Sequence, residues 1–190
     1  AFAREKLIGV GGELMEILCD VADGNAVREI FERFHPDRVI HAAVITAGDE
    51  REFREFDRIV DVNIKGTANV LTSALITGTG KVVYVSSGSA YGDALFAGAQ
   101  LLEEGPLVPD SLYSITKHAS ERICARFRRA RKLNVTCVRL GSVFGPWERG
   151  RVPRMMQLLG GRSGRMPGLL AQVHWGRGRG DRSLVTLVSP

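Results

Sequence analysis

Tyr113 and Lys117 stand four positions apart in the segment 110–121, which is predicted to begin a helix. Residues four apart on a helix lie on one face, so the phenol and the ammonium are expected side by side. A free tyrosine, with a pKa near 10, is a poor acid–base group at neutral pH, but a cation about 4–6 Å away favours the phenolate. At about 4 Å and an effective dielectric constant of about 20, one charge pair contributes about 4 kcal/mol. The pair is therefore able to exchange a proton with an alcohol or a carbonyl.

The helix that carries this pair lies between two predicted strands, Asp110 or Ser111 is expected to cap it, and Ile115 is expected to pack inward. The first strand, 81–85, runs into the polar loop 86–92, and the second, 133–140, runs into the loop 141–146. Open α/β sheets bind their ligands at the carboxyl ends of their strands. We therefore expect these loops to lie near the tyrosine and the lysine.

The preceding residues repeat the same alternation of helices and strands. A helix capped by Asp23 or Asn25 is expected to end at His35. It is followed by a strand at 38–44, in which we expect His41 to be a packed residue rather than a ligand, and by a long helix at 50–76 with Phe53 and Phe56 on its inward side. Alternation of this kind predicts an α/β fold, a doubly wound parallel sheet with helices on both faces. Gly66 inside the long helix costs about 1 kcal/mol relative to alanine, so we expect a packing reason for it.

Composition limits the function classes. The 190 residues are 44% hydrophobic and 25% charged, as in a soluble globular protein, and no apolar run approaches the roughly 20 residues that cross a bilayer. The three cysteines are odd in number and lack metal-ligand spacing, which predicts no metal site and a reducing, cytoplasmic setting. The basic cluster at 126–132 is expected to be the solvated end of a helix, so we predict neither a nucleic-acid nor a membrane partner.

Six short motifs follow one another along the chain: Asp20-Val21, His41-Ala-Ala43, Asn63-x-x-Gly-Thr67, Val85-Ser-Ser-x-x-x-Tyr-Gly92, Tyr113-x-x-x-Lys117 and Arg139-Leu-x-x-Val-Phe-Gly-Pro146. In this order and at these separations they resemble the extended short-chain dehydrogenase/reductases, which include the NAD-dependent sugar epimerases and dehydratases. The resemblance covers about residues 13–159. It implies a Rossmann-like fold and an enzyme that transfers a hydride between a nicotinamide cofactor and a sugar-like hydroxyl or keto substrate.

The resemblance also implies roles for individual residues. Ser87 would hydrogen-bond the reacting oxygen, Tyr113 would be the acid–base group, Lys117 would hold it ionised and bind the nicotinamide ribose, and Asn63 completes the catalytic set. The cofactor would be NAD or NADP, with NAD favoured, and the chain could form a homodimer through its long helices, 50–76 and 111–132. The residues expected to bind the cofactor are Asp20, Val21, Ala42, Ala43, Tyr113, Lys117, Gly141, Ser142 and Val143.

The sequence departs from the family's pattern at both ends. The family has a glycine-rich turn before its first helix, and Gly9-Val-Gly-Gly12 does not match that turn. We therefore expect residues 1–159 to form a partial dinucleotide-binding domain that starts after the first βαβ unit. A short helix is expected at 152–159, and residues 160–190 are expected to be an irregular tail rich in glycine and arginine. Ser142 stands where sugar-nucleotide enzymes often have asparagine, which weakens a nucleotide-sugar assignment. Two alternatives stay open, a non-catalytic nucleotide-binding relative and an inactive fragment of the enzyme.

Overall fold

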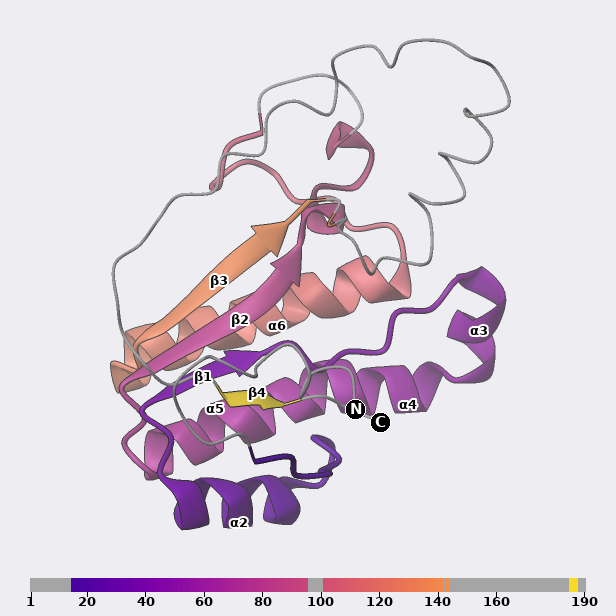
Figure 1. The fold of residues 1–190 in the computed structure, drawn as a ribbon. Helices are drawn as coiled ribbons and strands as arrows, with labels where there is room; N and C mark the ends of the chain where they lie inside the picture. The colour runs from indigo at the N-terminus through magenta and orange to yellow at the C-terminus, as the bar shows by residue number, and fades with distance from the viewer. Residues whose placement is uncertain (1–14, 96–100, 142, 144–184, 188–190) are drawn as a thin grey trace, which may run out of the picture. The chain divides into compact units, whose positions relative to one another are not determined.

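The computed structural model describes residues 15–95, 101–141, 143 and 185–187. Four strands form one sheet, in the order β3 (Val135–Leu140), β2 (Lys81–Ser87), β1 (Arg38–His41) and β4 (Val185–Leu187). Strand β1 pairs in parallel with β2 on one side and with β4 on the other, and Figure 1 shows β2 and β3 pointing in the same direction. The predicted Rossmann-like α/β fold is thereby confirmed, in an incomplete form.

Strand β4 comes from the stretch 160–190, where we expected no regular structure. Its register places Val185 beside Val39 and Leu187 beside His41. The short helix expected at 152–159 lies outside the described residues. The chain divides into two units, Ala1–Arg139 with Ser183–Pro190 and Leu140–Arg182, and the site described below is built from the first.

Helix α2 (Gly24–Phe34) begins and ends where the sequence predicts. The carboxylate of Asp23 accepts hydrogen bonds from the backbone N–H groups of Asn25 and Ala26, at 3.0 and 3.1 Å. The helix ends at His35, whose φ of 40° leaves the helical region. The buried side chains of Val27 and Phe31 join the helix to the core.

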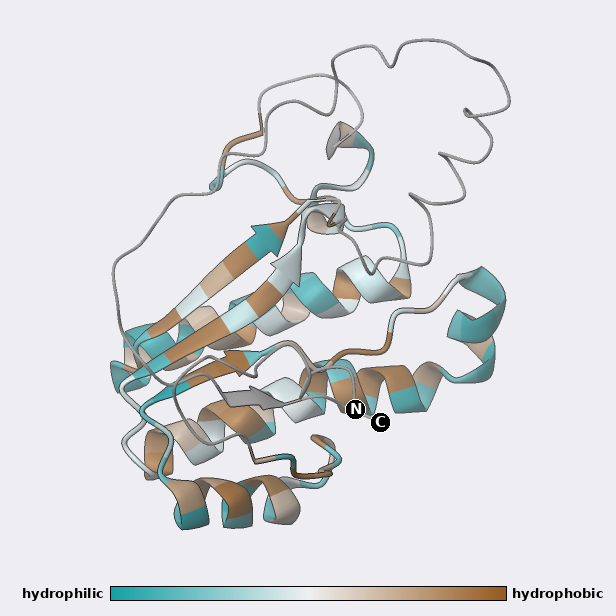
Figure 2. Cartoon of the chain, viewed as in Figure 1, coloured by the Kyte–Doolittle hydropathy of each residue, from teal (hydrophilic) through white to brown (hydrophobic). Residues whose placement is uncertain are grey.

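The long helix predicted at 50–76 is broken into four segments: α3 (Asp49–Arg54), α4 (Phe56–Val60), a π-helical turn η1 (Asp61–Lys65) and α5 (Gly66–Ile76). Glu55 separates the first two with a non-helical φ of −119° and ψ of 27°. The break shifts the helical phase, so Phe53 and Phe56, which we expected to face inward, are 82% and 50% exposed. Figure 2 shows α3 as mostly hydrophilic, which agrees with its outward position.

Helix α6 (Leu112–Arg131) begins with the predicted cap at Ser111. The hydroxyls of Ser111 and Ser114 each bond the backbone N–H of the other residue, at 3.2 and 3.0 Å, and so satisfy two N–H groups of the first turn. The helix ends at Lys132 in the left-handed region, after a last turn with the arginines that the helix dipole favours. Ile115, which we expected to pack inward, is 46% exposed.

The three long helices α2, α5 and α6 cover one face of the sheet (Figure 1). Alternate strand residues are buried against them, among them Val39, Val82, Tyr84 and Val135. Figure 2 shows the corresponding hydrophobic bands along β2 and β3. The second helical layer expected on the opposite face is not among the described residues. In the described part of the chain, no helix is long and apolar enough to cross a membrane, and no three His, Cys, Asp or Glu side chains are placed to hold a metal ion.

Gly66, as expected, has a packing reason for being a glycine. A Cβ added there would come within 2.7 Å of Cγ2 of Val21, which is 1% exposed in the core. We expect Gly66→Ala to lower the free energy of unfolding by about 1–3 kcal/mol, because overpacking outweighs the gain of about 1 kcal/mol in helix propensity. Urea unfolding measures the change. Gly48→Ala is the control, since nothing lies within 4 Å of its added Cβ, and equal effects at the two positions would contradict the close packing.

Candidate active site

Helix α6 places Lys117 beside Tyr113, as the spacing predicts. The Lys117 ammonium lies 5.8 Å from the ring centroid of Tyr113 and 5.0 Å from that of Tyr84 on β2. It also donates a hydrogen bond of 2.6 Å to the backbone carbonyl of Val85, near the carboxyl end of β2. Lys117 is 2% exposed, whereas Tyr113 is half-buried and so can meet a ligand.

Burial makes the Lys117 ammonium a stronger acid than the ammonium of an exposed lysine. The loss of solvation lowers its pKa to about 8, and the carboxylate of Glu121, one turn further along α6, opposes that change. At neutral pH the side chain still carries its proton, so a buried positive charge lies beside the Tyr113 ring. The same pKa places its deprotonation only slightly above neutrality.

Ser87 ends β2 and is half-buried. Its hydroxyl oxygen accepts hydrogen bonds from the backbone N–H and the hydroxyl of Ser89, at 3.2 and 2.9 Å. Val85, which accepts from Lys117, stands two residues earlier on the same strand. Lys117 therefore contacts β2 two residues before Ser87, with the Tyr113 ring beside it, at the edge where open α/β sheets bind ligands.

Asn63 lies in the π-helical turn, and its amide is fully used within the protein. Its oxygen accepts from the backbone N–H of Ile45 at 2.8 Å, and its nitrogen donates to the carbonyl of Ile45 at 3.1 Å and to the hydroxyl of Thr116 at 3.0 Å. Asn63 is 1% exposed. It ties the segment after β1 to α6 at Thr116, the residue before Lys117, and its direct catalytic role stays a prediction.

Asp20 and Val21, the predicted adenine contacts, form a tight turn before α2. One carboxylate oxygen of Asp20 accepts from the backbone N–H of Ala22 at 3.0 Å, and the other pairs with Arg58 at 2.9 Å. These contacts hold the pKa of Asp20 below its usual value. Asn69, which the sequence reasoning missed, donates to the carbonyls of Val21 and Ala22 from α5, at 2.9 and 3.3 Å.

The other predicted cofactor contacts fall into two groups. Ala42 and Ala43 follow β1 directly, and Ala43 belongs to the same buried cluster as Val21. Gly141 and Val143 follow β3 in the second unit, where both are exposed, and Ser142 lies outside the described residues. Cofactor binding by Ala42 and Ala43 stays a prediction.

The sequence reasoning also missed a buried ion pair. Arg139 on β3 bonds both carboxylate oxygens of Glu121, and Ser86 donates to one of them at 2.5 Å. Burial raises the pKa of Glu121, but the hydrogen bonds from Arg139 and Ser86 outweigh it and bring the pKa below the ordinary value. Glu121 follows Lys117 by four residues, a spacing that could have marked it as a neighbour of the lysine.

His41 is a packed strand residue, as we predicted, and it is 1% exposed. The single proton of the Thr67 hydroxyl is donated to the carbonyl of Asn63 at 2.7 Å, so His41 Nε2, 3.0 Å from that hydroxyl, is the donor in their hydrogen bond. Its Nδ1 is buried without a hydrogen-bond partner among the described residues. Burial lowers the pKa of His41 to about 3, and the Lys117 charge adds to that effect.

This burial predicts acid sensitivity. Unfolded His41 binds a proton with a pKa near 6.5, while folded His41 resists protonation down to about pH 3, so stability falls as the pH falls between these values. The difference contributes up to about 5 kcal/mol. We expect His41→Gln, which does not titrate, to flatten the pH dependence of unfolding in this window. His35→Gln, at an exposed position, is the control, and an unchanged slope in His41→Gln would contradict the prediction.

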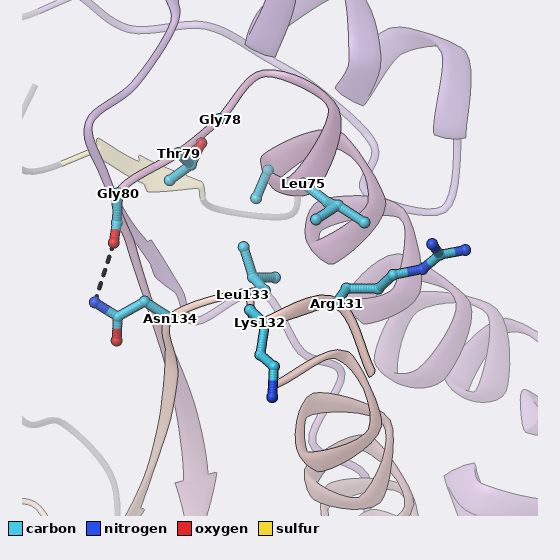
Figure 3. Close-up of a pocket in the computed structure, with 9 residues that line it drawn as sticks. Leu75, Gly78, Thr79, Gly80, Arg131, Lys132, Leu133 and Asn134 are labelled. Atoms are coloured by element: carbon cyan, nitrogen blue, oxygen red, sulfur yellow. Dashed lines mark hydrogen bonds between the residues drawn. The ribbon is translucent and has the colours of Figure 1, made fainter. Parts of the chain in front are cut away.

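A surface pocket lies at the opposite end of the strands from Lys117 (Figure 3). It has a volume of about 220 Å³ and is formed where α5 and α6 end and where β2 and β3 begin. In Figure 3 the side chains of Arg131 and Lys132 point in different directions, and Asn134 bonds the carbonyl of Gly80, at 3.1 Å. Because it faces the amino ends of the strands, this pocket is not part of the candidate site.

The sequence of the chain matches a known protein family and the sequences of known proteins. Residues 5–186 match the NAD dependent epimerase/dehydratase family. A probable dTDP-glucose 4,6-dehydratase of Sinorhizobium fredii is 31% identical over 137 residues, which are 67% of this chain and 39% of the relative. The chain thus spans about two fifths of that relative's length.

Solved structures agree with this match. DesIV, a dTDP-glucose 4,6-dehydratase of Streptomyces venezuelae with NAD bound, superimposes with a TM-score of 0.68 at 25% identity, over 83% of this chain and 49% of that one. RMD of Pseudomonas aeruginosa, complexed with NADPH, gives a TM-score of 0.67 at 25% identity, over 83% and 59%. From the family match, the shared parallel sheet and the order of its motifs, we conclude that the chain belongs to the NAD dependent epimerase/dehydratase family.

Proposed function

We propose that the protein is an NAD(P)-dependent oxidoreductase of the epimerase/dehydratase type that acts on a hydroxyl or keto group of a sugar-nucleotide-like substrate. One observation carries the proposal: a buried ammonium, Lys117, lies beside the half-exposed ring of Tyr113 at the strand end that carries Ser87. A buried cation next to a solvent-accessible phenol is the arrangement that acid–base chemistry at a carbinol or carbonyl oxygen requires.

Each of the three residues has one task in this proposal. The phenol oxygen of Tyr113 takes the proton from the substrate hydroxyl or returns it to the carbonyl oxygen. The charge of Lys117 stabilises the phenolate between these steps, and its bond to Val85 holds the ammonium in place. Ser87, whose hydroxyl oxygen accepts from Ser89, donates a hydrogen bond through its own proton to the substrate oxygen and stabilises the charge that develops there.

The proposed cofactor is inferred from the solved structures of the relatives. NAD(P) supplies the acceptor and donor of the hydride, with NAD favoured. The turn at Asp20 and Val21 and the small residues Ala42 and Ala43 would hold its adenosine half, and Lys117 would bind the ribose beside the reacting ring. Support comes from the solved relatives, which carry NAD or NADPH.

The substrate class and the assembly are proposals for the whole protein. The relatives' names point to dTDP-sugars, and the three cysteines, all free, agree with a reducing cytoplasm. A homodimer would cover the exposed apolar side chains of Phe53 and Phe56 on α3 and α4 and of Ile115 on α6.

A thermal-shift titration of the 190-residue chain with NAD⁺, NADH, NADP⁺ and NADPH tests the proposal. A ligand at 100 times its dissociation constant stabilises a fold by about 2.7 kcal/mol, so binding gives a clear upward shift. We expect the largest shift with NAD⁺ or NADH. A cooperatively melting sample that none of the four shifts would show that this chain does not form the cofactor site.

A further inference from the structure

The ion pair between Glu121 and Arg139 is held by several side-chain hydrogen bonds. Arg139 Nε donates to both carboxylate oxygens at 2.9 and 3.2 Å, and its Nη2 donates to Oε2 at 2.7 Å. The side chains of Glu121 and Arg139 are 8% and 19% exposed. With the bond from Ser86 added, both oxygens of the carboxylate have partners, so the pair is fully hydrogen-bonded in its buried site.

This pair joins the elements that carry the candidate catalytic residues. Glu121 lies on α6 one turn after Lys117, and Ser86 lies on β2 one residue before Ser87. The bond between the Ser86 hydroxyl and Glu121 therefore connects the two elements directly beneath the site. It sets the position of the strand end relative to the helix.

Arg139 extends the connection to the loops beyond β2. Its Nη1 donates to the hydroxyl of Tyr91 and to the backbone carbonyl of Glu103, both at 2.8 Å. The Tyr91 hydroxyl donates in turn to the carbonyl of Leu102 at 3.1 Å, and the guanidinium lies 5.0 Å from the centroid of the Tyr91 ring. The segment after Ser87 is thus held by the same guanidinium that holds Glu121.

A gain in the stability of the fold does not explain why this ion pair is buried. Removing two charges from water opposes their attraction, and well-packed apolar side chains often replace a buried ion pair without loss of stability. A carboxylate fixed near Lys117 supplies a negative charge there, which apolar residues cannot supply. The charged or titratable groups that face Lys117 are Tyr84 on β2, His41 on β1, and Tyr113 and Glu121 on α6, and among them Glu121 is the one that favours the ammonium.

We propose that Glu121 and Arg139 are positioning residues of the active site, which fix the Ser87 end of β2 against α6 and hold a carboxylate one helical turn from Lys117. The proposal rests on the proposed function for the meaning of that site. Its structural content concerns only the protein's own groups, so it can be tested without substrate or cofactor.

The test uses Glu121→Gln, the double variant Glu121→Leu/Arg139→Met, and Glu55→Gln as a control. The last removes a carboxylate that pairs with Arg51 on the exposed α3, at 2.8 Å. The charge of Lys117 is followed by an NMR titration of protein in which the lysines are labelled with carbon-13. The protein has five lysines, and the signal that is lost in Lys117→Arg is that of Lys117. Amide hydrogen exchange of residues 87–89 follows the strand end.

We expect the titration midpoint of Lys117 to move to lower pH in Glu121→Gln and in the double variant, and to stay unchanged in Glu55→Gln. We expect exchange at residues 87–89 to become about tenfold faster or more in the double variant, although its melting temperature stays near that of the wild type. A double variant with wild-type titration and exchange overturns the proposal. So does one that fails to fold, because the pair would then hold the whole fold rather than the site. A chain that binds no NAD(P) would contradict the proposed function and leave these readouts intact.

Discussion

Replacement of Tyr113 by phenylalanine is expected to lower turnover by about 10²–10⁴-fold, while the affinity for NADH changes by no more than about twofold. The substitution keeps the ring beside the Lys117 ammonium, 5.8 Å from its centroid, and removes only the oxygen that would carry the proton. Steady-state kinetics of the full-length protein with a panel of dTDP-, UDP- and GDP-sugars measures turnover. Quenching of protein fluorescence by NADH measures binding.

Tyr84→Phe is the matched control for this experiment. The Tyr84 ring also lies beside the Lys117 ammonium, at 5.0 Å, but the residue is 2% exposed and cannot reach a substrate. We expect its turnover to stay within about tenfold of the wild type, since it takes no part in proton transfer. Wild-type turnover in Tyr113→Phe would show that Tyr113 is not the acid–base group. The proposed role of Lys117 as its partner would then be wrong as well.

Local patterns in the sequence were enough to predict most of the sheet and the N-terminal caps of α2 and α6. Asp23 and Ser111 cap α2 and α6 because short polar side chains satisfy the first N–H groups of a helix, and this needs no distant partner. The proximity of Tyr113 and Lys117 is likewise a property of one helix. The order of the motifs then placed Ser87 at the neighbouring strand end.

What the sequence could not predict depends on contacts between distant residues. The amide of Asn63 is used by Ile45 and Thr116, which are 18 and 53 positions away, so its structural task is invisible along the chain. The partners Glu121 and Arg139 are 18 positions apart on different elements. Phe53 and Phe56 fit an apolar face only if the helix is continuous, and the break at Glu55 depends on packing that no local rule describes.

Gly92, in the loop after Ser87, is the glycine that the fold can least replace. Its backbone has a φ of 59° and a ψ of −141°, a conformation that side chains with a Cβ avoid. A Cβ added there would lie 2.0 Å from the backbone carbonyl oxygen of Val108, in the segment that leads into the Ser111 cap of α6. We expect Gly92→Ala to lower the free energy of unfolding by at least about 3 kcal/mol, because backbone strain and a clash with backbone atoms add together.

Two further glycines separate these causes in urea unfolding experiments. Gly78 also has a positive φ, 70°, but nothing lies within 4 Å of its added Cβ, so Gly78→Ala should show the strain alone, about 1–2 kcal/mol. Gly48→Ala has neither strain nor a neighbour, and we expect it to stay within about 0.5 kcal/mol of the wild type. If Gly92→Ala were no more harmful than Gly78→Ala, the close approach of Val108 would be wrong. If it is more harmful, the clash also displaces the entry to α6, and the Tyr113 helix start should show faster amide exchange in the same variant.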